Sequence, residues 1–188
     1  FYALLEFESA AESELDKAMA LFEQTVEQGW VLDGVLSQSL SQAEALWKLR
    51  EDISETLWHW QPYKNDISVL VSRMPEFLCE VDELVEKSYP DFELVWYGHI
   101  GDGNLHLNIL KPQTLSNEDF VARCVPVSKE IGQLLAKYEG SVSAEHGVGL
   151  LKKDYLHYSR SPLELELMKQ IKKVFDPNAI LNPGKLFD

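Results

Sequence analysis

Two histidines flank a glycine-rich turn in the segment from Tyr97 to Asn108, YGHIGDGNLHLN. Asp-Gly between alternating apolar and polar residues is a strong hairpin signal, because a type I′ turn needs positive φ at both central positions. Asp102 and Gly103 are expected to occupy these positions, so that His99 pairs with His106. Directly opposed residues have Cβ atoms about 4.5–5.5 Å apart. The spacing therefore predicts that two imidazoles can reach one metal ion.

The two faces of the expected hairpin differ in polarity, since side chains alternate along a strand. One face gathers Tyr97, His99, His106 and Asn108. The other face is apolar and is expected to point to the core, with Leu94, Trp96, Ile100, Leu105, Leu107 and Ile109. A glycine-rich turn with two surface histidines is the alternative, but the alignment of both histidines beside a polar asparagine favours a site. The glycines match neither a P-loop nor a dinucleotide fingerprint.

A second segment, from Ser143 to Gly149 (SAEHGVG), places an acid and a histidine side by side between small residues. Glu145 can complete a site of two histidines and one carboxylate that leaves positions open for a substrate oxygen. His146 points away from its neighbour in an extended segment and can act as a base near neutral pH. An N-cap acid and a surface histidine fit this local sequence equally well. For His59 and His157, structural or solvent-exposed roles are favoured.

These residues need a scaffold, and the chain alternates predicted strands with predicted helices. Strands are expected over residues 1–7, 30–37, 64–71 and, as a hairpin, 92–110. Helices are expected over residues 11–28, 41–57, 75–88, 116–138 and 161–176, and the second has a core stripe of Leu46, Leu49, Ile53 and Leu57. Capping boxes at Ser41 and Ser161 mark two of the helix starts. The pattern predicts an α+β fold: a ferredoxin-like antiparallel sheet with helices packed on one side, plus a C-terminal helical segment.

Composition limits the classes of function. The 188 residues are 45% hydrophobic and 26% charged, which predicts one globular domain over residues 1–188. The net charge of −14 argues against nucleic acids and anionic membranes as partners. No apolar run is long enough to span a bilayer. Cys79 and Cys124 show no CxxC spacing, which favours reduced cysteines in a cytoplasmic protein. The start at Phe1 suggests a piece of a longer protein.

Four segments together resemble the C-terminal domain of FAD-linked oxidases and dehydrogenases of the vanillyl-alcohol oxidase/p-cresol methylhydroxylase superfamily. They are LWKLRE ending at Glu51, residues 98–108, residues 143–149 and FDPNAILNPGK ending at Lys185. The resemblance is nearest the branch that holds D-2-hydroxyglutarate dehydrogenases, D-lactate dehydrogenases and glycolate oxidase subunits. It implies that His99, His106 and Glu145 bind a divalent metal, usually zinc, and that His146 is the base.

The same resemblance implies residues for the substrate and the cofactor. Arg50 and Lys64 would hold substrate carboxylates, with Ser54 and Asn108 as hydrogen-bonding neighbours. Ser54 stands where the family often has threonine, which keeps the hydroxyl. The tail residues Asn182 and Lys185 would return towards the flavin.

The implied reaction oxidises a D-2-hydroxy acid to the 2-oxo acid. The metal would act as a Lewis acid on the 2-hydroxyl, His146 would take its proton, and hydride would pass from C2 to FAD. FAD would be bound mainly by an FAD-binding domain upstream in the same polypeptide, and an external acceptor would take the electrons. Two basic residues place D-2-hydroxyglutarate ahead of D-lactate or glycolate. The resemblance also admits a homodimer.

Two other functions fit the same residues. Two histidines and a carboxylate suit ferrous iron in a non-haem oxygenase. A non-catalytic ferredoxin-like ligand-binding module would leave the histidine face as ordinary surface.

Overall fold

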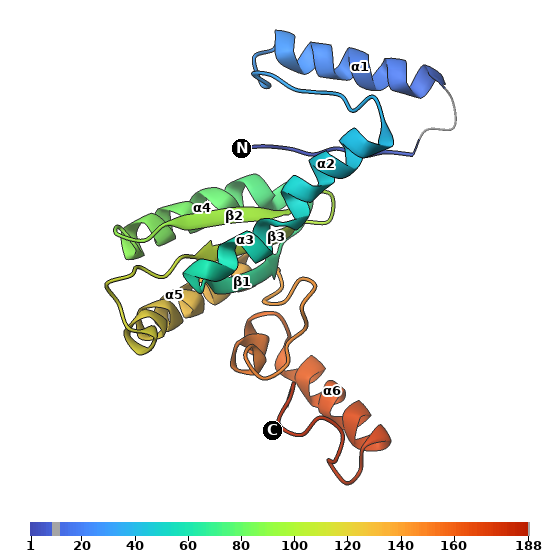
Figure 1. The fold of residues 1–188 in the computed structure, drawn as a ribbon. Helices are drawn as coiled ribbons and strands as arrows, with labels where there is room; N and C mark the ends of the chain where they lie inside the picture. The colour runs from blue at the N-terminus through green and yellow to red at the C-terminus, as the bar shows by residue number, and fades with distance from the viewer. Residues whose placement is uncertain (9–11, 188) are drawn as a thin grey trace. The chain divides into compact units, whose positions relative to one another are not determined.

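A computed structural model describes residues 1–8 and 12–187 of the chain, in two compact units, Phe1–Thr56 and Leu57–Asp188 (Figure 1). The first unit is helical. It contains α1 (Glu12–Glu27), α2 (Leu40–Glu51) and all but the last residue of α3 (Ile53–Leu57). Ser39 caps α2 by accepting a hydrogen bond from the Gln42 amide, so the helix begins two residues before the predicted capping box.

Three predictions for the first unit are wrong. Residues 1–7 and 30–37 form no strands, because a strand needs a neighbour for its N–H and C=O groups and neither segment has one among the described residues. The helix predicted over residues 41–57 is interrupted, since α2 ends at Glu51 and Asp52 is its C-cap. Leu49 of the predicted core stripe is 74% exposed.

The second unit contains a three-stranded antiparallel sheet, in the order β1-β3-β2. The strands are β1 (Tyr63–Ser68), β2 (Leu94–His99) and β3 (Asn104–Ile109), and α4 (Met74–Ser88) connects β1 to β2. The parallel strands β1 and β2 flank β3, as in the split β-α-β motif of ferredoxin-like folds. An isolated antiparallel bridge joins Ser68 to Ser141 at the free edge of β1, where the fourth strand of such a fold would lie. The α+β prediction is confirmed.

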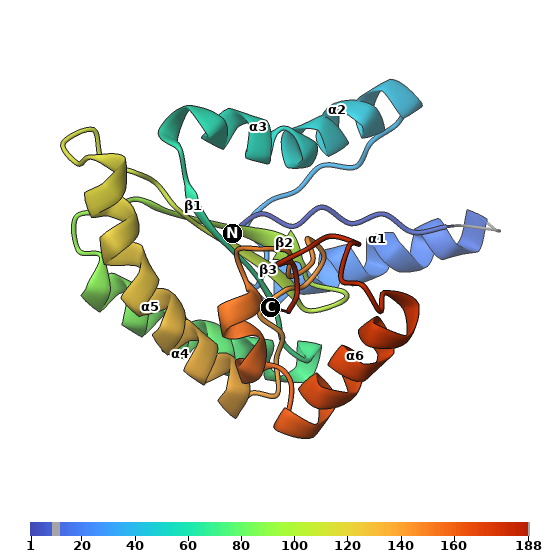
Figure 2. The same cartoon turned by 90° about the horizontal axis from the view of Figure 1, so that it is seen from below.

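Helices α4 and α5 (Asn117–Lys137) cover one face of this sheet (Figures 1 and 2). The core between them and the sheet includes Phe77, Val81, Val85, Leu107, Ile109, Ile131 and Leu135, each at most 1% exposed. The helix starts follow their caps: Ser116 accepts the Asp119 amide at α5, and Ser161 forms the predicted capping box with Glu164 at α6 (Pro162–Phe175). Short 3-10 helices occur at η1 (Trp58–Trp60), η2 (Val71–Arg73) and η3 (Lys153–Tyr158). Among the described residues, no helix combines the length and the apolarity that crossing a membrane requires.

The hairpin forms, but its register differs from the predicted one. His99 lies opposite Asn104, and His106 lies opposite Tyr97. The turn covers residues 100–103 in place of a two-residue type I′ turn, because the Gly103 carbonyl accepts the Val69 amide (3.2 Å) just beyond β1. The partner of each residue moves by two positions, so both histidines keep the predicted face. Ile100 lies in the turn and is 70% exposed, which contradicts its predicted core position.

Candidate active site

The sheet face turned away from α4 and α5 is polar and is organised in three rows across the strands. Strand register defines the rows as Lys64, Asn108 and Val95; Asp66, His106 and Tyr97; and Ser68, Asn104 and His99. Four of these polar side chains are almost fully buried, namely Asp66, Asn104, His106 and Asn108. Burying polar groups is costly unless they have partners, so the rows point to a preorganised site.

The loop that follows α5 brings Glu145 and His146 to the middle row. Ser68 and Ser141 exchange both backbone hydrogen bonds (3.0 and 2.8 Å), and the Ala144 amide donates to the Asp66 carbonyl (3.3 Å). A Cβ at Gly140 would lie 2.6 Å from the Ser68 carbonyl oxygen, so the close approach requires glycine there. The edge of β1 therefore fixes where this loop crosses the sheet.

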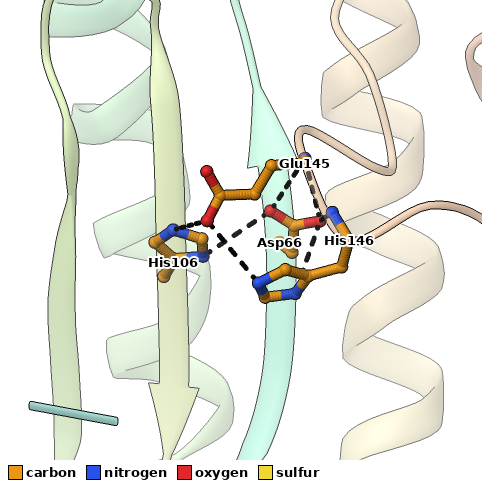
Figure 3. Close-up of side chains that lie close together, drawn as sticks. All are labelled: Asp66, His106, Glu145 and His146. Atoms are coloured by element: carbon orange, nitrogen blue, oxygen red, sulfur yellow. Dashed lines mark hydrogen bonds and ion pairs between the residues drawn. The ribbon is translucent and has the colours of Figure 1, made fainter. Parts of the chain in front are cut away.

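Glu145 links the histidines through its two carboxylate oxygens. Its Oε1 lies 3.1 Å from His106 Nε2 and 3.6 Å from His146 Nε2 (Figure 3). Its Oε2 lies 3.7 Å from His99 Nδ1 and accepts a 2.8 Å hydrogen bond from Asn104 Nδ2. The structure thus brings together the three predicted metal ligands and the predicted base around one carboxylate.

Bonds of about 2.0–2.2 Å in tetrahedral geometry hold ligand atoms about 3.3–3.6 Å apart. His106 Nε2 lies 3.1 Å and His146 Nε2 3.6 Å from the same Glu145 oxygen, Oε1, whereas His99 Nδ1 lies 3.7 Å from the other oxygen, Oε2. Among the described residues, one group of side chains brings possible metal-binding atoms within 4.8 Å of one another, namely Asp66, His106, Glu145 and His146. This group includes Asp66, which sequence reasoning missed, and His99 stands beside it.

Asp66 is 1% exposed, and its carboxylate lies beside the two stacked imidazoles and next to Glu145 (Figure 3). Its Oδ1 is 3.6 Å from His106 Nδ1, and its Oδ2 is 3.6 Å from His146 Nδ1. Burial raises the pKa of this carboxyl, but hydrogen bonds from the His146 amide and from Lys152 outweigh it and hold the pKa below its ordinary value. Asp66 is therefore a charged carboxylate inside the site.

The other predicted residues lie on several elements. Lys64 and Asn108 are paired neighbours on β1 and β3, on the site face. Arg50 and Ser54 belong to α2 and α3 of the first unit. Their part in substrate binding stays a prediction.

The predicted cofactor residues lie in the C-terminal tail. Lys185 Nζ donates to Asn182 Oδ1 (3.3 Å), and the Leu186 amide donates to the Gly149 carbonyl (3.0 Å). The tail thus contacts the loop that carries Glu145 and His146, and the contact of its residues with a flavin stays a prediction.

Residues 1–186 match the family model described as FAD linked oxidases, C-terminal domain. The chain is 62% identical over 187 residues to a D-2-hydroxyglutarate dehydrogenase of Stutzerimonas stutzeri (strain A1501). It is 55% identical over 188 residues to a D-2-hydroxyglutarate dehydrogenase of Xanthomonas citri pv. viticola. A putative mitochondrial D-lactate dehydrogenase of Schizosaccharomyces pombe shares 39% over 196 residues, which is 98% of this chain and 36% of that protein. In the two bacterial relatives the match spans 100% of this chain and 40% of their length.

Proposed function

The chain belongs to the family of C-terminal domains of FAD-linked oxidases, and from this we propose that it is the substrate- and metal-binding part of a D-2-hydroxy acid dehydrogenase. The observation that carries the proposal is the single carboxylate, Glu145, between three imidazoles. FAD, held mainly by another domain of the same polypeptide, supplies the hydride acceptor. Family membership favours this reaction over an iron oxygenase or a non-catalytic module.

We assign His99, His106 and Glu145 as metal ligands. Two neutral imidazole nitrogens and one carboxylate oxygen are a donor set that zinc accepts while keeping a position for substrate. When bound, the ion supplies Lewis acidity to the substrate's 2-hydroxyl. The chain's own contribution is a preorganised set of donors, since His106 is 5% exposed and hydrogen-bonding distances already join Glu145 to His106 and Asn104.

We assign His146 as the base that receives the 2-hydroxyl proton. Its side chain is 52% exposed, whereas that of His106 is 5% exposed, so a substrate can reach only the first of these two rings. Glu145 Oε1 and Asp66 Oδ2 lie 3.6 Å from its two ring nitrogens. Two carboxylates stabilise the imidazolium that proton uptake produces.

We assign Lys64 and Asn108 to substrate binding, together with Arg50 and Ser54 of the first unit. Lys64 is exposed beside buried Asn108, whose Oδ1 has no hydrogen-bond partner among the described residues. A lysine ammonium and an arginine fork can each bind a carboxylate, which favours a substrate with two. The relatives' names agree with D-2-hydroxyglutarate as that substrate.

The test uses the full-length flavoenzyme and an artificial electron acceptor with D-2-hydroxyglutarate, D-lactate and glycolate. His146→Gln should lower kcat about 10²- to 10⁴-fold, the usual contribution of a general base, and removing the metal with a chelator should abolish turnover. His157→Gln, in η3, is the control and should keep wild-type kinetics. Wild-type turnover in His146→Gln would contradict the assignment of the base.

A further inference from the structure

Asp66 contacts both imidazoles of the cluster at the ring nitrogen that Glu145 does not face. In His106 and in His146 alike, Nε2 faces Glu145 and Nδ1 faces Asp66. When Nε2 of His106 binds a metal ion, the remaining proton of the ring is on Nδ1, where the Asp66 carboxylate can accept it. One buried carboxylate thus faces Nδ1 of a proposed ligand and of the proposed base together.

Asp66 also holds the loop that carries these groups. The backbone amides of Glu145 and His146 donate to its carboxylate, at 3.3 and 3.0 Å from Oδ2. These hydrogen bonds join residues 79 and 80 positions apart in the chain. Removal of the carboxylate would release both amides, and with them the position of the Glu145 and His146 side chains.

Lys152 completes this arrangement. Its Nζ lies 3.0 Å from Asp66 Oδ2 and 3.0 Å from the Asp66 carbonyl oxygen, and its side chain is 19% exposed. Its own amide donates to the Val148 carbonyl (3.1 Å), which ties the ammonium to the end of the same loop. A buried carboxylate needs such a partner, because an unpaired buried charge is strongly destabilising.

The donors around Asp66 argue that it does not bind the metal itself. Two backbone amides and one ammonium already approach its oxygens within 3.3 Å, and a carboxylate has about four acceptor positions. Its side chain is 2% exposed, against 44% for Glu145. Glu145 faces the open side of the cluster, and Asp66 lies beneath it.

We propose that Asp66, held by Lys152, is a positioning residue that sets the ring orientation of His106 and His146 and fixes Glu145 over the sheet. The proposal rests on the proposed function of this site. Partners of this kind behind a metal ligand typically change metal affinity or activity by about 10- to 100-fold.

The experiment compares full-length Asp66→Asn with Asp154→Asn, which removes an exposed acid from η3. Zinc affinity is measured by chelator competition, and kcat and KM are measured with zinc in excess. Asp66→Asn should weaken zinc binding about 10- to 100-fold and lower kcat with saturating zinc, while KM for D-2-hydroxyglutarate stays near wild type. The control, Asp154→Asn, should match wild type in zinc affinity, kcat and KM.

The cobalt-substituted enzyme separates positioning from ligation. A positioning role predicts that the visible bands of the cobalt form of Asp66→Asn keep the intensity of the wild-type coordination number, because the ligand set is unchanged, although the bands can shift in wavelength. A change in band intensity to that of another coordination number would overturn the proposal in favour of ligation. Values equal to those of Asp154→Asn would overturn any role of Asp66 in the site.

Lys152→Met covers the case in which Asp66→Asn does not fold, as judged by thermal unfolding. Lys152→Met should weaken zinc binding and lower kcat, as expected for Asp66→Asn. Wild-type zinc affinity and kcat in Lys152→Met would overturn the proposal. A wild-type enzyme that binds no metal and oxidises no D-2-hydroxy acid would instead refute the proposed function.

Discussion

At the scale of single residues, the site depends on how Glu145 divides its two oxygens. Oε1 faces His106 and His146, and Oε2 faces His99 and Asn104. The side-chain amide of Asn104 donates a 2.8 Å hydrogen bond to Oε2, and its nitrogen lies 3.3 Å from His99 Nδ1. Asn104 therefore holds the Glu145 carboxylate beside His99. Asn104 is thus a second support for the proposed ligands, from the sheet.

Asn104→Ala should therefore weaken zinc binding by about 10-fold or more, in the range typical of groups that orient metal ligands. Chelator competition with the full-length protein measures the effect. Asn117→Ala, on the exposed first residue of α5, is a matched control that removes the same side chain away from the site. Equal zinc affinity in the two variants would mean that Glu145 does not need Asn104.

The two hairpin histidines were predictable from local sequence, the roles of Glu145 and His146 came from the family resemblance, and Asp66 came from neither. His99 and His106 stand out because a turn signal and alternation place them on one polar face. Asp66 occupies one position of a strand, where a lone acid usually indicates solvent. Its partners are amides and an ammonium 79 to 86 positions later, and no local pattern reports such contacts.

At the scale of elements, the turn of the β2–β3 hairpin is set by a contact with Val69, the residue that follows β1. Gly103 has φ +76°, and a Cβ on it would collide with the Val69 carbonyl oxygen. Gly101 in the same turn has nothing within 4 Å of its ideal Cβ position. The contact to Val69 explains why Asp-Gly did not produce the predicted two-residue turn, since a neighbouring strand can override local preference.

Gly103→Ala should destabilise the protein by more than about 1–2 kcal/mol, the cost of a left-handed backbone for a residue with a Cβ, because the collision adds to it. Gly101→Ala should stay within about 0.5 kcal/mol of wild type, as is usual for a surface substitution. Urea unfolding of both variants measures the difference. A Gly103→Ala protein as stable as Gly101→Ala would show that the turn can move off Val69.

The end of α6 is a second element whose stability has a defined origin. The buried Asp176 carboxylate accepts hydrogen bonds from Lys172 Nζ (2.6 Å) and from the amides of Ile180 and Leu181 (2.9 and 3.1 Å). The hydrogen bond from Lys172 and those from the two amides lower the pKa of this carboxyl. The capping box at the start of α6 was predicted from the sequence, whereas the hydrogen bonds that Asp176 accepts from amides beyond Pro177 were not.

A lowered pKa in the folded state means that Asp176 stabilises the tail above the carboxyl's ordinary pKa and loses this effect as pH falls through the folded-state value. Exchange of the Ile180 and Leu181 amides, after correction for intrinsic rates, should therefore accelerate on acidification below the ordinary pKa of aspartate. Asp176→Asn should show fast exchange already at neutral pH. Protection that is unchanged in the variant would contradict this account.

At the scale of the whole chain, the two units differ in what holds them together. Every residue of the main hydrophobic cluster lies between positions 67 and 142, in the second unit. Among the described residues of the first unit, none is buried, and exposed apolar side chains include Trp30, Leu32 and Val35. The prediction of one domain over residues 1–188 rests on length and composition and stays a prediction. Apolar periodicity reports that a helix has an apolar face and not what covers that face.

Local stability follows buried apolar contacts, so amides in different parts of one protein can open with very different free energies. We expect amides of α1 and α2 in the 188-residue chain to exchange at least about 100-fold faster than those of α4 and α5, which supply Phe77, Val81, Ile131 and Leu135 to the core. Hydrogen–deuterium exchange with mass spectrometry resolves these helices as separate peptides.

Because Arg50 and Ser54 lie in the first unit, D-2-hydroxyglutarate should slow exchange in α2 and α3 of the full-length enzyme and leave α4 unchanged. Equal protection of the two units would contradict the first expectation. A substrate effect confined to the second unit would separate Arg50 and Ser54 from the site built on the sheet.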